Sequence, residues 1–176
     1  MEFLNPINAF NGLQEFLGVG GNVLFVIMIA TFAMWTFIVE RYAYYRLAHK
    51  ATKKRLKAEW KAREDKRSWR AHAIRDEMIS EIKFKTDQNV GIIKTLVAIA
   101  PLLGLLGTVT GMISVFDVMA LSGSSSARLM AGGIFKATIP TMAGMVSALS
   151  GLYFSNQLDR RSKRETARFA DELEIG

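Results

Sequence analysis

One apolar run, from Ile92 to Met119, constrains the fold of this 176-residue chain more than any other feature. Lys94 near its start and Asp117 near its end are its only charged residues. The run is longer than the roughly 20 residues that an α-helix needs to cross a bilayer. We therefore expect a membrane-spanning helix here.

Three glycines, Gly104, Gly107 and Gly111, lie within eight residues of this run. In water each would weaken a helix by about 1 kcal/mol relative to alanine. In lipid a helix keeps its backbone hydrogen bonds, so glycine there usually marks a close helix approach. Together with Ala100 these glycines form a stripe of small residues, and another helix should lie against it. Pro101, inside the same span, should kink the helix.

Two further apolar segments complete a set of three spans. The first runs from Asn22 to Val39, and the last extends from about Met130 to Asn156. The last span carries its own stripe of small residues, and the two stripes can face each other or equivalent helices of neighbouring subunits. Its members are Gly133, Ala137, Thr141, Gly144, Ala148, Gly151 and Ser155.

The basic residues are clustered beside these spans. The net charge is +7, yet no Lys or Arg precedes Arg41, whereas twelve lie in 41–70 and five in 160–168. The positive-inside rule then places both clusters in the cytoplasm and the N-terminus outside. The first cluster, with Trp60 and Trp69, could also be interpreted as a nucleic-acid surface, but charge beside apolar spans is explained more simply by membrane orientation.

The sequence therefore predicts an all-α integral membrane protein with three transmembrane helices extended by cytoplasmic helices, the N-terminus periplasmic and the C-terminus cytoplasmic. The expected segments are a periplasmic amphipathic segment at 1–21, a first transmembrane helix at 22–41, charged cytoplasmic helices at 42–89, a second transmembrane helix at 90–120, a short periplasmic loop at 121–129, a third transmembrane helix at 130–157 and a cytoplasmic C-terminal helix at 158–176.

The segments outside the membrane carry little chemistry. Pro6 suits the first position of a helix that lies on the membrane surface, although 1–21 could equally be a loosely ordered tail. The charged segment 42–89 lacks Pro and Gly and looks too short and too polar to form a separate domain. His49 and His72 are expected to be solvated. The chain has no cysteine and no nucleophile motif or phosphate loop, so we expect neither an enzyme nor a cofactor.

Threonines lie near the middle of the second and third spans. Counted from Ser125 in the connecting turn, Thr108 lies about 17 residues before and Thr141 about 16 after, so the two should share a depth. Thr110 and Thr138 form a second pair nearby. These hydroxyls could line a polar pathway, or each could simply bond a carbonyl of its own helix.

Asp117 and Lys136 are the charged residues within the hairpin formed by these spans. Both lie near its outer end, where they either form an ion pair or lie separately at the interface. The middle of the hairpin holds no carboxylate or histidine. Because a proton relay needs a titratable group, a partner helix would have to supply it.

The motif from Pro101 to Ile113, together with Gly133-Ile134, Thr141 and Gly144, resembles the MotA/TolQ/ExbB proton-channel family. The resemblance implies a multi-pass protein of the bacterial inner membrane that forms a pentameric ring. It also implies an ExbD/TolR-like single-span partner that supplies a membrane aspartate, and a TonB-like protein that passes on the work. Thr108 and Thr141 match the family's pore threonines. The helix-packing residues are Pro101, Gly104, Gly107, Gly111, Gly144 and Gly151.

One residue departs from the family pattern, because Lys136 stands where family members commonly have a glutamate. Three functions remain open at this point. An ExbB-like subunit would energise outer-membrane uptake, a TolQ-like subunit would serve envelope integrity, and a non-conducting scaffold would use its threonines only for packing.

Overall fold

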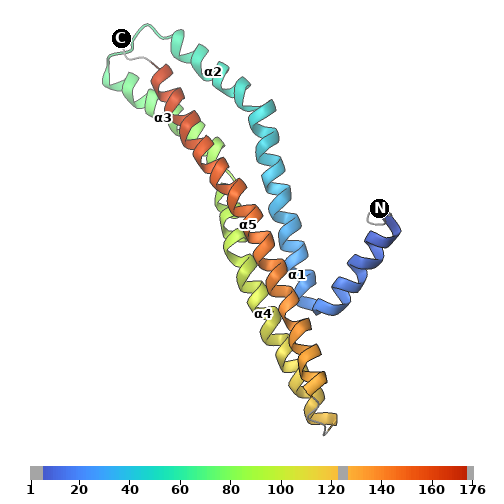
Figure 1. Cartoon of the computed structure of the whole chain (residues 1–176). Coiled ribbons are helices and arrows are strands. Elements are labelled where there is room, and N and C mark those ends of the chain that lie inside the picture. Colours follow the sequence, from blue (N-terminus) through green and yellow to red (C-terminus); the bar gives the residue numbers. More distant parts are fainter. Residues whose placement is uncertain (1–5, 123–126, 174–176) are drawn as a thin grey trace. The chain divides into compact units, whose positions relative to one another are not determined.

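The computed structural model is entirely helical over the residues that it describes, which are 6–122 and 127–173, with side chains described from residue 21 except at 122 and 129. Five helices follow one another: α1 (Pro6–Leu47), α2 (His49–Lys61), α3 (Trp69–Asp87), α4 (Val90–Ser122) and α5 (Ala127–Glu172) (Figure 1). Three helical stretches are long and apolar enough to cross a membrane, in α1, α4 and α5. This confirms the predicted all-α fold over the described residues, and the three apolar stretches are compatible with the predicted membrane protein.

Two residues with positive φ interrupt the helical path. Gly21, with φ 66° and ψ −166°, breaks α1 in two. Glycine reaches this conformation without the steric cost that a Cβ imposes. Asn89, with φ 64°, separates α3 from α4, and asparagine is among the few other residues that tolerate this region. The helix begins at Pro6, as the sequence suggested, but residues 1–5 of the predicted periplasmic segment lie outside the described part of the chain.

The chain divides into two compact units, and α1, α4 and α5 each contribute to both. The first unit contains residues 1–34 and 95–151. Small residues form its α4–α5 contact, large side chains of α1 such as Met34 are also buried, and many large apolar ones, such as Phe32, Leu102 and Phe135, are exposed. An apolar exterior over a helix contact of small residues is the pattern expected of helices packed in lipid.

The second unit contains residues 35–94 and 152–176. The charged segment 42–89, which we did not expect to form a separate domain, shares a core with the end of α5. That core comprises Leu56, Trp60, Ala71, Met78, Ile82, Phe169 and Leu173, all less than 9% exposed. The C-terminal residues complete a core that 42–89 could not form alone. α5 runs unbroken to Glu172, so the third span and the C-terminal helix are one helix.

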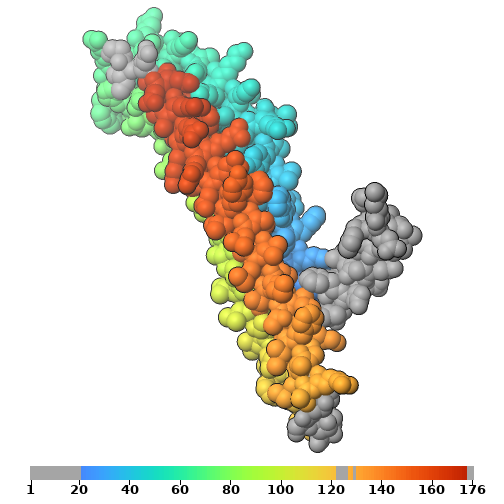
Figure 2. Space-filling model, in the orientation of Figure 1, coloured from blue at the N-terminus to red at the C-terminus, as the bar shows by residue number. Residues whose placement is uncertain are grey.

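Polar contacts fix the helices of the second unit to one another. Arg75 donates hydrogen bonds to the carbonyl oxygens of Ala170 (2.8 Å) and Leu173 (3.1 Å), which are left without helical partners at the end of α5. Arg55 reaches Glu81 at 2.7 Å, and Glu172 accepts from Lys53 at 2.9 Å. Figure 2 shows the second unit's surface over α2 and the end of α5.

His49 is a further correction, because it is buried and not solvated. Its side chain is 7% exposed and its Nε2 lies 3.2 Å from Glu165 Oε2. The rings of Tyr44 and Tyr45 lie beside it, at 6.2 and 5.7 Å between centroids. This histidine, the first residue of α2, is enclosed because α5 passes next to it, which no local pattern of 42–89 indicates. His72 is exposed, as expected.

Candidate functional site

The two stripes of small residues pack against each other within one chain, which is the first of the two arrangements considered. A Cβ added to Gly104 would lie 2.9 Å from the Cα of Thr141, and one added to Gly144 would lie 2.5 Å from the carbonyl oxygen of Ala100. A Cβ on Gly111 would lie 2.8 Å from that of Ala137. The backbones of α4 and α5 are therefore in contact along this line, and only glycine fits there.

Side chains of the facing helix pack against other glycines of the stripes. The ring of Pro140 packs against Gly107, and Val115 packs against Gly133. Gly151 contacts Met34 of α1 and Val97 of α4, so it joins three helices. Gly104, Gly107, Gly111, Gly144 and Gly151 thus all lie at close helix contacts.

Pro101 of α4 and Pro140 of α5 differ in their surroundings. Pro101 lies inside α4, which continues as a helix past it. Pro140 is fully buried against Gly107, a contact that sequence reasoning missed. Pro140 lies inside an apolar span, but nothing in the sequence indicates that Gly107 is its partner.

The four predicted pathway threonines make two kinds of hydrogen bond. Thr141 Oγ1 donates to the carbonyl oxygen of Gly104 at 2.9 Å, across the contact between α5 and α4. Thr108, Thr110 and Thr138 each donate to carbonyls of their own helix, at 2.7–3.1 Å. Thr141 is therefore the one of the four whose hydroxyl bonds another helix.

The register of α4 and α5 locates these hydroxyls. Thr141 lies opposite Gly104 and Pro140 opposite Gly107, so Thr108 and Thr141 lie within about one helical turn of each other along the hairpin. Thr108 and Thr110 are two residues apart on α4, and their side chains leave the helix about 200° apart. The four threonines cannot all face one pathway.

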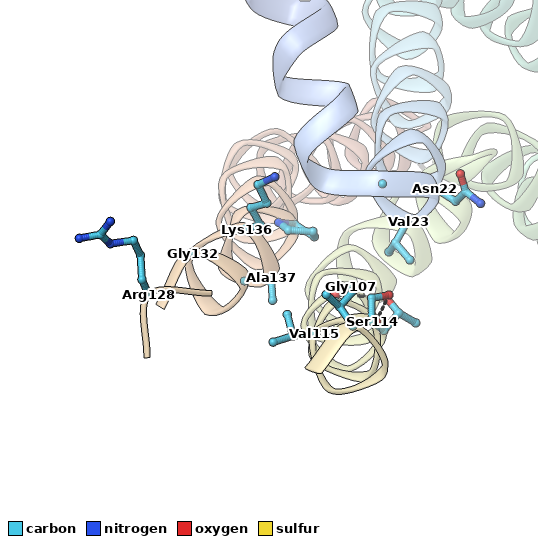
Figure 3. Close-up of a pocket in the computed structure, with 15 residues that line it drawn as sticks. Asn22, Val23, Gly107, Ser114, Val115, Arg128, Gly132, Lys136 and Ala137 are labelled. Carbon is cyan, nitrogen blue, oxygen red and sulfur yellow. Dashed lines mark hydrogen bonds between the residues drawn. The ribbon is translucent and has the colours of Figure 1, made fainter. Parts of the chain in front are cut away.

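A pocket of about 730 Å³ lies among the start of the first span, α4 and α5 (Figure 3). Thr110 lines it, whereas Thr108, Thr138 and Thr141 do not. Lys136 also lines it, and so does Arg128 from the first turn of α5. The pocket and the Thr108–Thr141 pair thus lie on different sides of the α4–α5 contact.

Of the two alternatives left open for Asp117 and Lys136, the structure has the second: among the described residues no ion pair or hydrogen bond joins them, and both are exposed. The register explains why. Val115 packs on Gly133, which puts Asp117 level with Ala131, about five residues or 7–8 Å along the axis from Lys136.

A second polar contact lies inside the first unit and was also missed. Thr31 Oγ1 lies 2.7 Å from Ser147 Oγ and also donates to the carbonyl of Ile27. Ser147 is only 6% exposed. This pair ties α1 to α5, and its sequence signal is faint because each is a single hydroxyl in an apolar span.

Comparison with known proteins adds the family. The model of the MotA/TolQ/ExbB proton channel family matches residues 44–171, more than half of the chain. The chain belongs to this family. The match takes in α2 and α3 as well as α4 and α5, so the MotA/TolQ/ExbB resemblance extends through the second unit and beyond the glycine motif.

Three individual relatives support the assignment of this chain to the MotA/TolQ/ExbB family. The chain is 40% identical over 90 residues to the putative biopolymer transport protein ExbB-like 1 of Synechocystis, a match that covers 48% of this chain and 35% of that protein. It is 38% identical over 65 residues to ExbB-like 3 of the same organism, covering 36% and 31%. The chain thus spans about a third of these two relatives. It is 28% identical over 140 residues to the biopolymer transport protein ExbB of Helicobacter pylori, covering 80% and 81%.

Proposed function

We propose that this chain is an ExbB-like subunit of a proton-driven motor in the bacterial inner membrane. The observation that carries the proposal is the hydroxyl of Thr141, held against Gly104 at 2.9 Å where two glycine-packed spans meet. The Thr141 hydroxyl lies within about one helical turn of Thr108 along the hairpin, and neither threonine lines the pocket. Two hydroxyls at one level of a tightly packed hairpin provide a polar site that a proton carrier can approach.

The proton carrier itself would come from a partner. Asp117 is the only acid between residues 95 and 151, and there is no histidine. Because Asp117 lies near the outer end of α4, no group of this chain can take up and release a proton at mid-depth. A single-span helix of the ExbD/TolR type, bearing an aspartate, would supply that group.

The wider assembly follows from the family. Several copies of this chain, five by the family pattern, would form a ring around the partner helices. Proton flow through the partner's aspartate would move the ring against the partner, and a TonB-like protein would transmit the work to outer-membrane transport. In this assembly the chain is a transport subunit and not an enzyme. The three relatives described above are named ExbB or ExbB-like, which favours this role over TolQ-like service.

The test is proton flux into vesicles that contain this chain and its single-span partner. Thr141→Val and Thr108→Val keep the side-chain shape and remove the hydroxyl. We expect each to lower flux at least tenfold while the complex still assembles, because one interhelical hydrogen bond in a membrane contributes only about 0.6 kcal/mol to stability.

Two controls separate conduction from packing. Thr141→Ser keeps the hydroxyl and should retain most of the flux. Thr110→Val removes a hydroxyl on the pocket side of α4 and should conduct like wild type. If Thr141→Val and Thr108→Val also conduct like wild type, the threonines serve packing, and the non-conducting scaffold is the better description.

A further inference from the structure

The pocket beside the hairpin has a composition that the proposed function does not use. Its volume of about 730 Å³ lies within the range of small-molecule sites. Glycines, Val23, Val115 and Pro140 form much of its wall. Such a wall can accept an apolar chain, and nothing in proton conduction requires it.

The charged groups of this pocket are all cationic. Lys136 and Arg128 line it, and no Asp or Glu is among its described lining residues. Neither cation forms an ion pair or hydrogen bond with another described residue. The lining hydroxyls of Thr110 and Ser114 already donate to carbonyls of α4. The pocket therefore offers two positive charges whose donors are available to a ligand.

A cation at this depth needs a polar partner, and an anion is the strongest one. Lys136 lies nine residues into α5, about 13 Å from the start of that helix. Cations inside a span pair with an acid, a carbonyl or a water-filled cavity, because burying them alone in lipid is costly. The nearest acid of this chain along the hairpin, Asp117, neither lines the pocket nor contacts Lys136.

We propose that this pocket binds the headgroup of an anionic phospholipid. Lys136 and Arg128 are eight residues apart, about 12 Å along α5. In Figure 3 Lys136 points toward the start of the first span, and Arg128 extends outward from the first turn of α5. Lys136 is thus the inner contact of the phosphate and Arg128 the outer one, at the rim where headgroups lie. Basic pockets between spans are known to hold anionic headgroups, and the pocket's volume leaves room for the first part of an acyl chain.

Lipid binding by the purified full-length protein tests this site. Native mass spectrometry would measure retention of dioleoylphosphatidylglycerol against dioleoylphosphatidylcholine. We expect wild type to prefer the anionic lipid at least tenfold. Lys136→Gln should lose most of that preference and Arg128→Gln part of it, since charge-assisted hydrogen bonds are roughly twice as strong as neutral ones.

Matched variants keep the test specific. Arg164→Gln removes an exposed charge of α5 that lies outside the pocket and should bind like wild type. Lys136→Arg keeps the charge and should keep the preference, which separates loss of the site from loss of the fold. Equal retention of the two lipids, or equal binding by Lys136→Gln and Arg164→Gln, would overturn the proposal.

Two other anions are distinguished in the same experiment. If inorganic phosphate displaces the lipid at equal concentration, the site is for a free anion and the lipid assignment is wrong. The other candidate is Asp117 of a second copy. The chain has no cysteine, so Asp117→Cys and Lys136→Cys, placed on separate copies, can cross-link only between molecules. A strong cross-link, together with unchanged lipid binding in Lys136→Gln, would also overturn the lipid site.

Discussion

The two units of this protein pack by opposite rules. In the first unit α4 and α5 touch through glycine, and bulky apolar side chains such as Leu102 and Phe135 point outward. In the second unit large side chains such as Trp60 and Phe169 are buried, and ion pairs lie around them. The same helix, α5, belongs to the first unit up to Gly151 and to the second unit beyond it.

The difference in packing between the two units matches what is expected of helices in lipid and of helices in water. Lipid is as apolar as leucine, so burying leucine in a membrane gains little, and close backbone approach provides the packing. In water, burial of large apolar groups is the main stabilising term. Substitutions in the two units should therefore destabilise the protein for different reasons: overlap with a neighbouring backbone in the first unit and loss of a buried apolar side chain in the second.

Phe169→Ala should have the largest effect on stability. Phe169 is fully buried in the second unit, and removing a buried aromatic ring typically costs about 3–5 kcal/mol. We expect the amides of α2 and α3 to lose protection in hydrogen exchange while those of α4 between Ala100 and Gly111 keep theirs.

The matched control is Phe84→Ala, since Phe84 lies in the same unit but is 73% exposed. It should change protection little. If the two variants were equally destabilised, the second unit would not have the water-type core described above, and the contrast between the units would fail.

Gly144→Ala should have the next largest effect, and in the other unit. The new Cβ would lie 2.5 Å from a carbonyl oxygen of α4, and backbone cannot move aside as a side chain can. Overpacking usually costs about 1–3 kcal/mol. The detergent-solubilised protein should melt at a lower temperature, as followed by size-exclusion chromatography after heating.

Gly132→Ala provides the comparison for that variant, because an added Cβ there meets nothing within 4 Å. It should be neutral or slightly stabilising, since alanine favours helix over glycine by about 1 kcal/mol. A Gly144→Ala protein that melted like Gly132→Ala would contradict backbone contact between α4 and α5.

The contrast also explains what the sequence could predict. The membrane-type unit was foreseen because its rule is local: Gly104, Gly107 and Gly111 recur at helical spacing, and their partners lie across one short turn. The threonine register was foreseen to within about a turn by counting from that turn. The helix bonds of Thr108, Thr110 and Thr138 match the alternative in which a hydroxyl bonds its own helix.

The water-type unit was missed because its core joins residues far apart in the sequence. Phe169 shares a core with Leu56 and Ile82, and no spacing within 42–89 indicates that Phe169 is part of it. The burial of His49 beside Glu165 was missed for the same reason. Whether Asp117 and Lys136 form a pair could not be decided from the sequence, since counting from a turn gives depth only to within a few residues.

The smallest predicted effect is a pH dependence at the edge of the second unit. Asp65 Oδ1 accepts hydrogen bonds from the backbone amides of Ser68 (3.0 Å) and Arg67 (3.1 Å), just before α3. Ser68 in turn caps α3 by accepting from Ala71 N at 3.2 Å. The hydrogen bonds from Ser68 are the main reason that the pKa of Asp65 lies below its ordinary value of 3.8.

Because the folded pKa is lowered, this stabilisation is complete above pH 3.8 and is lost as the pH falls further and the carboxylate takes up a proton. Protection of the Ser68 and Ala71 amides, each normalised to its intrinsic exchange rate, should therefore decrease between pH 5 and pH 3. In Asp65→Asn the acceptor is uncharged throughout, so that protein should be less protected at pH 5 and should change less. An equal decrease in both proteins would assign the pH dependence to another group and leave the turn before α3 held by Ser68 alone.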